Sequence, residues 1–265
     1  QVAIVVAGLL VGTAIISSSY VIQTTFDFGI RSSVFHQLDL IDELVVKNGP
    51  SGGREPFNAS AYDGLRADLS AGALPDVAAI APRYMVAGSA FDNTSSLLEP
   101  STAVIGFNAS LDLGTFVRPD GSAWDGSGLG PADAIVNQAF ANDTEAKVGD
   151  LLLAFIGTSS RPTPLTVRAV VLDSGRGALD GGANVFVRLD TVQAVLGTPG
   201  QINLITVANV GGVTQGYLRT DKVDAQLEDA LPASLGLSVS NVKADDVDQA
   251  TRNVDQLSQI FLLLG

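Results

Sequence analysis

Side chains that could carry out catalysis are scarce in this sequence. It contains no cysteine and one histidine, His36, so thiol nucleophiles and thiolate zinc sites are excluded. A serine–histidine–aspartate triad would have to use His36, which falls in a stretch expected to stand beside a membrane. We therefore predict no catalytic residues, no metal site and no cofactor in this chain, and interpret His36 as a surface or packing residue.

The other polar motifs favour structural roles. Asp245, Asp246 and Asp248 begin a helical pattern, where carboxylates stabilise the positive end of the helix dipole. The glycine-rich run 126–130 is followed by Pro131 and no strand precedes it, which is typical of a turn rather than a phosphate-binding loop. The GxxxxGK[ST] pattern does not occur in the sequence, so the chain is not expected to bind ATP in that way.

Composition points to a membrane protein that does not bind nucleic acid. The 265 residues carry a net charge of -13, and only 16% are charged whereas 46% are apolar. A nucleic-acid-binding surface needs clustered lysine and arginine, and the acidity also opposes docking by charge onto anionic lipids. Few charges and many apolar residues indicate that part of the chain lies outside water.

The N-terminal stretch has the length and composition of a membrane-spanning helix. Residues 2–26 contain no charged side chain, and about 20 apolar residues suffice to cross a bilayer. Gly8 and Gly12 form a GxxxG step, which suits tight packing against another membrane helix. A signal peptide and a buried core helix are the alternatives, although the basic start of a signal peptide is missing. We predict a transmembrane helix that continues outward as a stalk, over 1–38.

The C-terminal stretch shows a matching pattern. Residues 244–259 are mostly polar, with apolar residues at helical spacing, and residues 260–265 are almost wholly apolar. This pattern predicts a second stalk helix, over 244–265, that leads into the start of a second membrane span. Both ends of the chain would then meet the same membrane surface, with membrane lipid as a partner.

Between the two ends, the sequence predicts an α+β fold of two parts. Strand–helix–strand patterns occur twice and fit a split, ferredoxin-like α+β subdomain over 39–95 and 201–243. Their strands and helices are expected over 39–47, 61–71 and 76–90 (one strand or a pair), then over 201–210, 222–231 and 235–242.

The segment 96–200 differs in residue composition, and its pattern predicts an inserted β-rich subdomain. It is rich in glycine, proline and short apolar runs that are typical of strands joined by turns. We expect strands over 104–107, 150–156, 165–172 and 184–187, and helices over 132–141 and 189–196.

Several segments of the sequence resemble parts of the extracytoplasmic core of MacB-like and FtsX-like permeases. Residues 134–141 and 146–150 resemble a short helix followed by a Gly-Asp turn into a strand, and 184–200 resemble a strand, a helix and a Gly-x-Pro-Gly turn. Residues 202–207 resemble the next strand, and 8–19 resemble the family's first membrane helix. The motif residues that we assign a structural role are Gly149, Asp150, Gly197, Pro199 and Gly200.

The resemblance implies a role in an ABC transporter. Such permeases act as dimers with a cytoplasmic ATPase and transmit ATP-driven motion across the membrane, for substrate export, extraction or the regulation of a partner. The chain would be a non-catalytic subunit in the cell membrane with its main domain, including a porter-like α+β part, on the extracytoplasmic side. ATP would bind to the partner.

Two other functional classes remain open from the residues alone. A signal-anchored, extracytoplasmic ligand-binding module without transporter activity would share the anchor and the folded domain. An anchored enzyme such as a hydrolase would need a pocket with clustered carboxylates of raised pKa. No such cluster can be recognised in the sequence.

Overall fold

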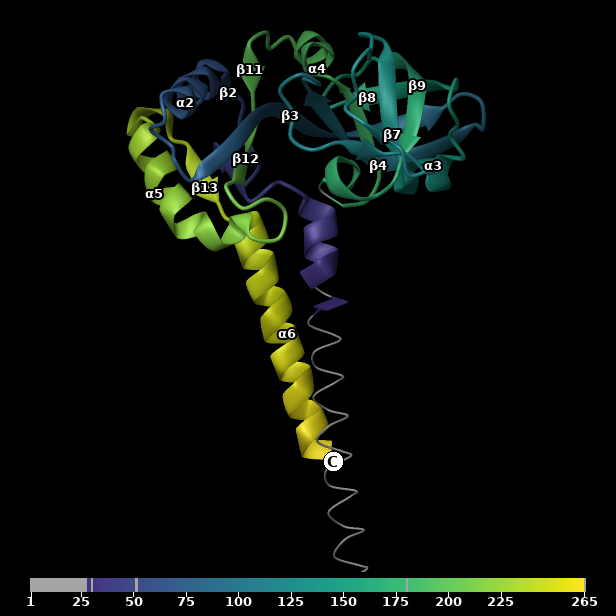
Figure 1. Ribbon diagram of the computed structural model, residues 1–265. Coiled ribbons are helices and arrows are strands. Elements are labelled where there is room, and N and C mark those ends of the chain that lie inside the picture. Colours follow the sequence, from purple (N-terminus) through teal and green to yellow (C-terminus); the bar gives the residue numbers. More distant parts are fainter. Residues whose placement is uncertain (1–27, 30, 51, 180, 265) are drawn as a thin grey trace, which may run out of the picture.

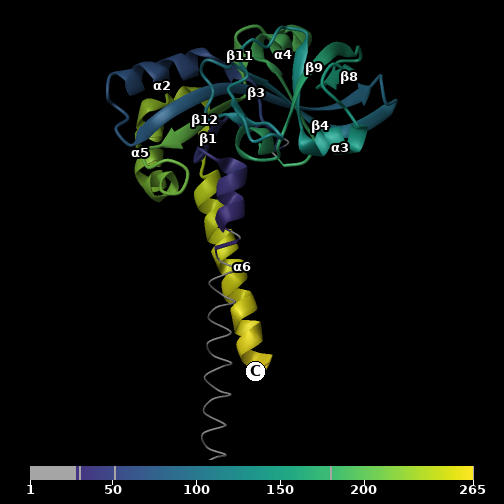
Figure 2. The same cartoon turned by 45° about the vertical axis from the view of Figure 1, so that its right-hand side comes forward.

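The protein has a folded body from which two helices leave side by side (Figures 1 and 2). The computed structural model describes residues 28–29, 31–50, 52–179 and 181–264. The predicted N-terminal membrane helix, with Gly8 and Gly12, lies outside these described residues. Within them, no helix combines the length and the apolar character needed to cross a bilayer.

The first part of the body is a four-stranded antiparallel sheet with two helices. Its strands follow the order β13-β1-β12-β3. Helices α2 and α5 cover one face of this sheet, where Tyr62 and Leu65 of α2 pack with Val223 and Leu227 of α5. The elements are β1 (Glu43–Val46), α2 (Ser60–Ser70), β3 (Val77–Asp92), β12 (Leu204–Asn209), α5 (Thr220–Ala230) and β13 (Ser238–Ser240).

The second part is a closed barrel. From β3 the sheet continues through β4, β10, β7, β9 and β8, and β8 pairs again with β3, so these six strands form a ring. Two pairs, β10 with β4 and β7 with β9, are parallel. The elements are β4 (Leu97–Phe107), β7 (Asp133–Asn137), α3 (Gln138–Thr144), β8 (Leu151–Ile156), β9 (Thr163–Val171), β10 (Asn184–Arg188) and α4 (Leu189–Leu196).

Short elements complete the body, and one long helix leaves it. The 23-residue α6 (Val242–Leu264) leaves the body beside the N-terminal helix over 31–38. The short elements are β2 (Phe57–Asn58), β5 (Phe116–Val117), β6 (Ala123–Trp124), η1 (Gly175–Ala178), β11 (Gln201–Ile202), η2 (Gly216–Arg219) and η3 (Ala233–Leu235).

Strand β3 belongs to both parts of the body. Its first half pairs with β12 up to Arg83, and its second half pairs with β8 from Gly88 onward. Between the two partners, the Asn203 side chain takes the place of a strand. Its Oδ1 accepts a hydrogen bond from the Met85 N–H (2.8 Å) and its Nδ2 donates to the Met85 carbonyl (2.7 Å). The backbone of β3 is thus satisfied where it changes partner.

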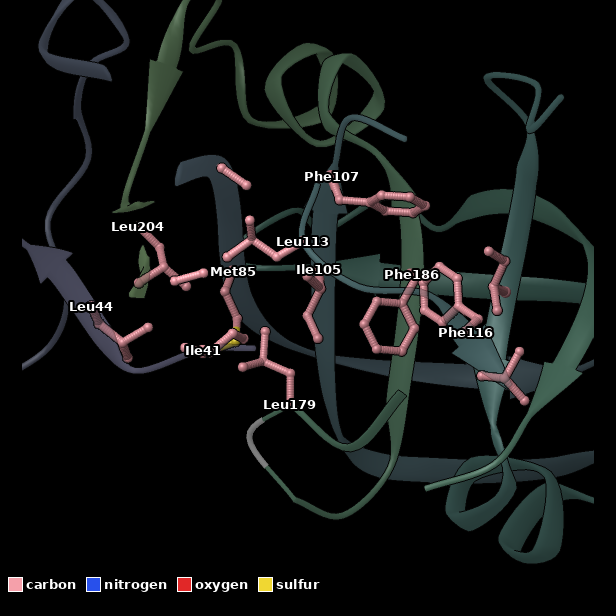
Figure 3. Packing of buried hydrophobic residues seen from close by; sticks show 14 of the residues in the cluster. Ile41, Leu44, Met85, Ile105, Phe107, Leu113, Phe116, Leu179, Phe186 and Leu204 are labelled. Atoms are coloured by element: carbon pink, nitrogen blue, oxygen red, sulfur yellow. The ribbon is translucent and has the colours of Figure 1, made fainter. Parts of the chain in front are cut away.

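One hydrophobic cluster joins the two parts (Figure 3). It includes Leu44 of β1 and Leu204 of β12 together with Ile105 of β4. At its barrel end, three phenylalanine rings meet edge to face, with centroids 5.0 Å apart for Phe116 and Phe186. Such aromatic contacts stabilise beyond the area that they bury. Two further clusters fill the barrel and the space under α2 and α5.

Most predicted elements are confirmed, and one helix was predicted wrongly. The helix predicted over 132–141 is the buried strand β7 followed by α3. A short apolar run that is buried on both faces has no alternation, and periodicity cannot separate such a strand from a helix. Asn137 marks the change, because its side chain caps α3 by accepting a hydrogen bond from the Phe140 N–H.

Other boundaries also differ from prediction. The strand predicted over 201–210 is split into β11 and β12 at Asn203. The strand predicted over 235–242 shrinks to β13, because η3 and Gly236 (φ 62°) precede it. The stretch 76–90 forms one strand, β3, rather than a pair. Strand β4 begins at Leu97, well before the predicted 104–107.

Candidate functional site at the junction of the terminal helices with the body

The two terminal helices, called here the stalk helices, are the helix over 31–38 and α6. They contact each other through a hydrogen bond from Arg31 Nη2 to Thr251 Oγ1 (3.1 Å). Val247, Ala250 and Val254 form a buried stripe along α6, at the three- to four-residue spacing of a packed helix face. The pair therefore forms one antiparallel unit beneath the body (Figure 1).

A buried ion pair fixes α6 to the body at its first turn. Lys243 Nζ lies 2.8 Å from Asp42 Oδ1, and both side chains are at most 1% exposed. The same ammonium group donates to the carbonyls of Asp39 (2.5 Å) and Val213 (3.3 Å). Lys243 thus binds the end of one stalk helix, the start of β1 and the loop after β12. Breaking a buried pair of this kind strongly destabilises a protein, because the remaining charge has no partner.

Asp39 ends the first stalk helix in an unusual backbone conformation. Its φ is 47°, the left-handed conformation that commonly terminates helices. The side chain packs against two barrel loops, because a Cβ on Gly114 would lie 2.5 Å from Asp39 Oδ2 and one on Gly175 would lie 3.3 Å away. Burial raises the pKa of Asp39, while Lys243 and Arg176 act in the opposite direction.

Buried charges continue from Asp39 into the barrel. The Asp112 carboxylate binds Arg83 of β3 (2.7 Å) and Arg176 of η1 (3.3 Å), and all three side chains are 1% exposed. Arg176 also donates to the carbonyls of Leu113 (3.0 Å) and Gly114 (2.5 Å). These bonds hold the loop after β4 against the barrel wall. Both guanidinium groups thus have the Asp112 carboxylate as a partner, which lowers the cost of burying their charges, while Arg83 Nη1 has no hydrogen-bond partner among the described residues.

Glu43, next to Asp42, is a second buried acid in this region. Its Oε1 accepts hydrogen bonds from Asn209 Nδ2 and Thr220 Oγ1, both at 2.7 Å. Burial raises its pKa to about 7, and the charges of Asp42 and Asp224 add to the rise. Asn209 also binds Asp42, because its backbone N–H donates to Asp42 Oδ2 (2.8 Å). We call Asp39, Asp42, Glu43, Asn209 and Lys243 the stalk junction.

The predicted motif residues lie away from the stalk junction, in turns. Gly149 has a φ of 99° and donates to the Val167 carbonyl (2.8 Å). Asp150 Oδ2 accepts from the Lys147 N–H (2.7 Å). Gly197 ends α4 in the left-handed conformation. The turn that follows it contains Pro199 and Gly200, whose carbonyl accepts from Ala59 N. Gly8 and Gly12 lie outside the described residues.

The acidic and glycine-rich motifs are likewise separate from the junction's ion pair. Asp245, Asp246 and Asp248 lie in the first two turns of α6, where the helix dipole favours them. The glycine-rich run 126–130 is a turn on the wall of an open cavity of about 600 Å³. The carboxylates at this cavity, Asp125 and Asp190, have lowered pKa values because hydrogen bonds stabilise their charged forms. Neither therefore has the raised pKa expected of a general acid.

His36 lies on the exposed side of the first stalk helix. It lines a cleft of about 270 Å³ between that helix and the barrel, together with Ser33, Gln37 and Asp173. Among the described residues, no group of three or more His, Cys, Asp or Glu side chains could hold a metal ion. The cleft leaves space beside the stalk helix at the point where it meets the barrel.

Sequence reasoning missed the stalk junction, although two signals for it exist. Asp42 and Glu43 are adjacent acids at the start of an otherwise apolar strand, and Lys243 is the only cation between Lys222 and Arg252. A cation far from other cations and two acids at the start of an apolar strand are candidates for a buried ion pair. Their pairing could not be predicted, because about 200 residues separate them and nothing local specifies the contact.

Comparisons with known proteins give a family and two solved domains. A family model described as the MacB-like periplasmic core domain matches residues 2–234. The extracellular domain of the noncanonic ABC-type transporter YknZ from Gram-positive bacteria is similar at 13% identity and a TM-score of 0.49, over 75% of this chain and 98% of that one. The periplasmic region of MacB from Actinobacillus actinomycetemcomitans is similar at 12% identity and a TM-score of 0.48, over 82% and 94%. Among curated proteins, none matches the sequence.

Proposed function

Because the chain belongs to the family of MacB-like periplasmic core domains, we propose that it transmits movements of membrane helices to an extracytoplasmic body in an ABC-transporter permease. An ATPase in a partner chain would drive the movement, and the permease would act as a dimer in the cell membrane. The chain itself would contribute no catalytic group. Its task would be mechanical coupling between two conformational states.

The observation that carries this proposal is the buried contact of Lys243 with Asp42 and Asp39. A movement of α6 relative to the first stalk helix must either carry the start of β1 along or break a buried ion pair. The second alternative is costly, because it leaves an uncompensated charge out of water. A displacement of the stalk helices is therefore expected to reach the sheet through β1.

From β1, two routes lead into the barrel. One is the sheet itself, since β1 pairs with β12 and β12 pairs with β3, the strand shared with the barrel. The other is the contact of Asp39 with the loops at Gly114 and Gly175. The strand order β13-β1-β12-β3 with α2 and α5 on one face supports the assignment of the first part as a split ferredoxin-like layer.

The test uses the full-length permease with its ATPase in lipid nanodiscs. Because this chain has no cysteine, the pair Asp63→Cys and Asn142→Cys can carry spin labels on α2 and α3, one on each part of the body, with native cysteines elsewhere replaced. We expect their distance to change between the nucleotide-free and ATP-bound states, because movement of the stalk helices is transmitted into the body. An unchanged distance would refute the proposal.

Removing the ion pair tests the role of Lys243. Lys243→Met alone should destabilise the protein by about 3–5 kcal/mol, because Asp42 stays buried without its partner. The double variant Lys243→Met with Asp42→Asn removes both charges and should fold. It should lose the nucleotide-dependent distance change, whereas the surface control Lys222→Met should keep it. A double variant that moves like the unmodified protein would show that coupling does not pass through this pair.

A further inference from the structure

We propose that Glu43 carries a proton in the folded protein, and that this proton stabilises the stalk junction so that its loss loosens the contact between the stalk helices and the sheet. The junction would then respond to extracytoplasmic pH. The binding of the proton is independent of any transport role, whereas its effect on coupling rests on the proposed function.

The hydrogen bonds around Glu43 favour a protonated side chain. The residue is 0% exposed, and two donors share its Oε1. Its other oxygen, Oε2, is buried and has no hydrogen-bond partner among the described residues, and the same holds for Asn209 Oδ1. Two buried acceptors without donors are costly, with roughly 1–3 kcal/mol for each unsatisfied group.

A single proton supplies the missing donor. Asn209 Nδ2 already donates to Glu43 Oε1 (2.7 Å). We expect a proton on Glu43 Oε2 to donate to Asn209 Oδ1, so that the acid and the amide would exchange two hydrogen bonds. A carboxylate cannot make the second bond, because it has only acceptors. The neutral form would therefore satisfy two buried oxygens that have no donor among the described residues.

The surrounding charges also oppose ionisation. Asp42 precedes Glu43 in the chain, and Asp224 faces it from α5; both disfavour a further negative charge. Two cations of the surrounding elements are already engaged, since Lys243 of α6 binds Asp42 and Arg219 of η2 binds Asp76, and Lys222 of α5 is exposed to solvent.

The remaining elements around Glu43 bring no compensating positive charge. Strands β12 and β13 contain no titratable side chain. On α6, Asp245 adds negative charge near Asp224 and near Asp246. Burial, with the charges of Asp42 and Asp224, raises the pKa of Glu43 to about 7 against the hydrogen bonds from Asn209 and Thr220, and near this value a modest change in pH changes its charge.

Asn209 connects the proton to the ion pair. Its side chain binds Glu43 and the Gly216 carbonyl (3.2 Å), and its backbone N–H binds Asp42. When Glu43 ionises, a second negative charge appears beside Asp42, in a site whose one ammonium group is already shared. We expect Asn209 to shift and the contacts of Lys243 to weaken, so that α6 follows the body less tightly.

The proton is tested directly by infrared titration of the full-length protein in nanodiscs. We expect a band of a protonated carboxyl group to disappear as pH rises through about 7, and the same loss to be missing from the difference spectrum of Glu43→Gln. Glu99→Gln, which alters an acid of β4, is the matched control and should keep the band. If Glu43→Gln shows the same titrating band as the unmodified protein, the proton is not on Glu43 and the proposal fails.

A second variant guards against misfolding of the first. Thr220→Val removes one donor to Oε1 and should shift the midpoint of the band to higher pH, because that donor favours the charged form. An unshifted midpoint would contradict the assignment.

The consequence for coupling is tested by the pH profile of ATP hydrolysis. It should differ between the unmodified transporter and Glu43→Gln, and should be unchanged in Glu99→Gln. If the band titrates but the two profiles coincide, the proton does not control the junction. The spin-label distances test the transmission of movement independently of this result.

Discussion

The stability of the folded body should depend on pH in a way that Glu43→Gln removes. The pKa of Glu43 is about 7 in the folded protein and 4.5 in the unfolded chain. Between these values the folded state holds a proton that the unfolded state has lost, so the free energy of unfolding falls as pH rises. The contribution is complete below the lower value, decreases across the window from 4.5 to about 7, and is constant above it.

The magnitude follows from the separation of the two pKa values. At about 1.36 kcal/mol per pKa unit, the separation corresponds to roughly 3 kcal/mol. A glutamine keeps the acceptor for Asn209 and Thr220 and adds an amide that can donate to Asn209 Oδ1. Glu43→Gln should therefore fold with the same hydrogen bonds and without the pH-dependent contribution.

The assay is urea-induced unfolding of the unmodified protein and of Glu43→Gln at about pH 4.5 and about pH 8. Relative to the unmodified protein, the variant should gain roughly 3 kcal/mol on going from the lower to the higher pH. Other acids with raised pKa values, such as Asp42 and Asp224, contribute to both proteins and largely cancel in this difference. A difference that stays constant with pH would refute the reasoning.

Two further substitutions test how the body is held together. Asn203→Leu should destabilise the protein by about 2–4 kcal/mol, because the buried N–H and carbonyl of Met85 lose their partners; amide hydrogen exchange at Met85 should speed up, and unchanged exchange would count against the strand-substitute role. Gly114→Ala should cost about 1–3 kcal/mol, measured by chemical denaturation, since its φ is 67° and the new Cβ would meet Asp39 Oδ2. Gly128→Ala is its control: the φ is 80° with no described atom within 4 Å, so it carries only the backbone strain, and equal losses would show that the Asp39 contact adds nothing.

The spacing of apolar residues predicted correctly those elements that have one exposed face and one buried face. Helices α2, α4 and α5 each bury one stripe of side chains, and their predicted bounds differ from the observed ones by at most two residues. Strand β7 was predicted wrongly as part of a helix, because all five of its residues are buried and the alternation that marks a strand is therefore missing. The family resemblance, based on turns such as Gly149 and Gly197, is borne out by the matching family model.

The stalk junction and the barrel closure depend on contacts that are remote in sequence. The Lys243–Asp42 pair joins the two ends of the described chain, and the pairing of β8 with β3 closes the ring across about 60 residues. Neither contact leaves a periodic signal. The role of Asn203 could not be predicted either, because it depends on the gap that β12 and β8 leave along β3 and not on its neighbours in the sequence.

The shared strand also governs how the body can meet other copies of itself. Unpaired strand edges attract foreign strands and promote aggregation. Because β3 pairs with both β4 and β8, the strands of the barrel form a closed ring, and the barrel presents no open edge. Outside the barrel, the described sheet is open at β13, a strand of three residues with serine at both ends, and along residues 77–82 of β3, which pair with β12 alone. Another chain could add by backbone pairing at these two margins.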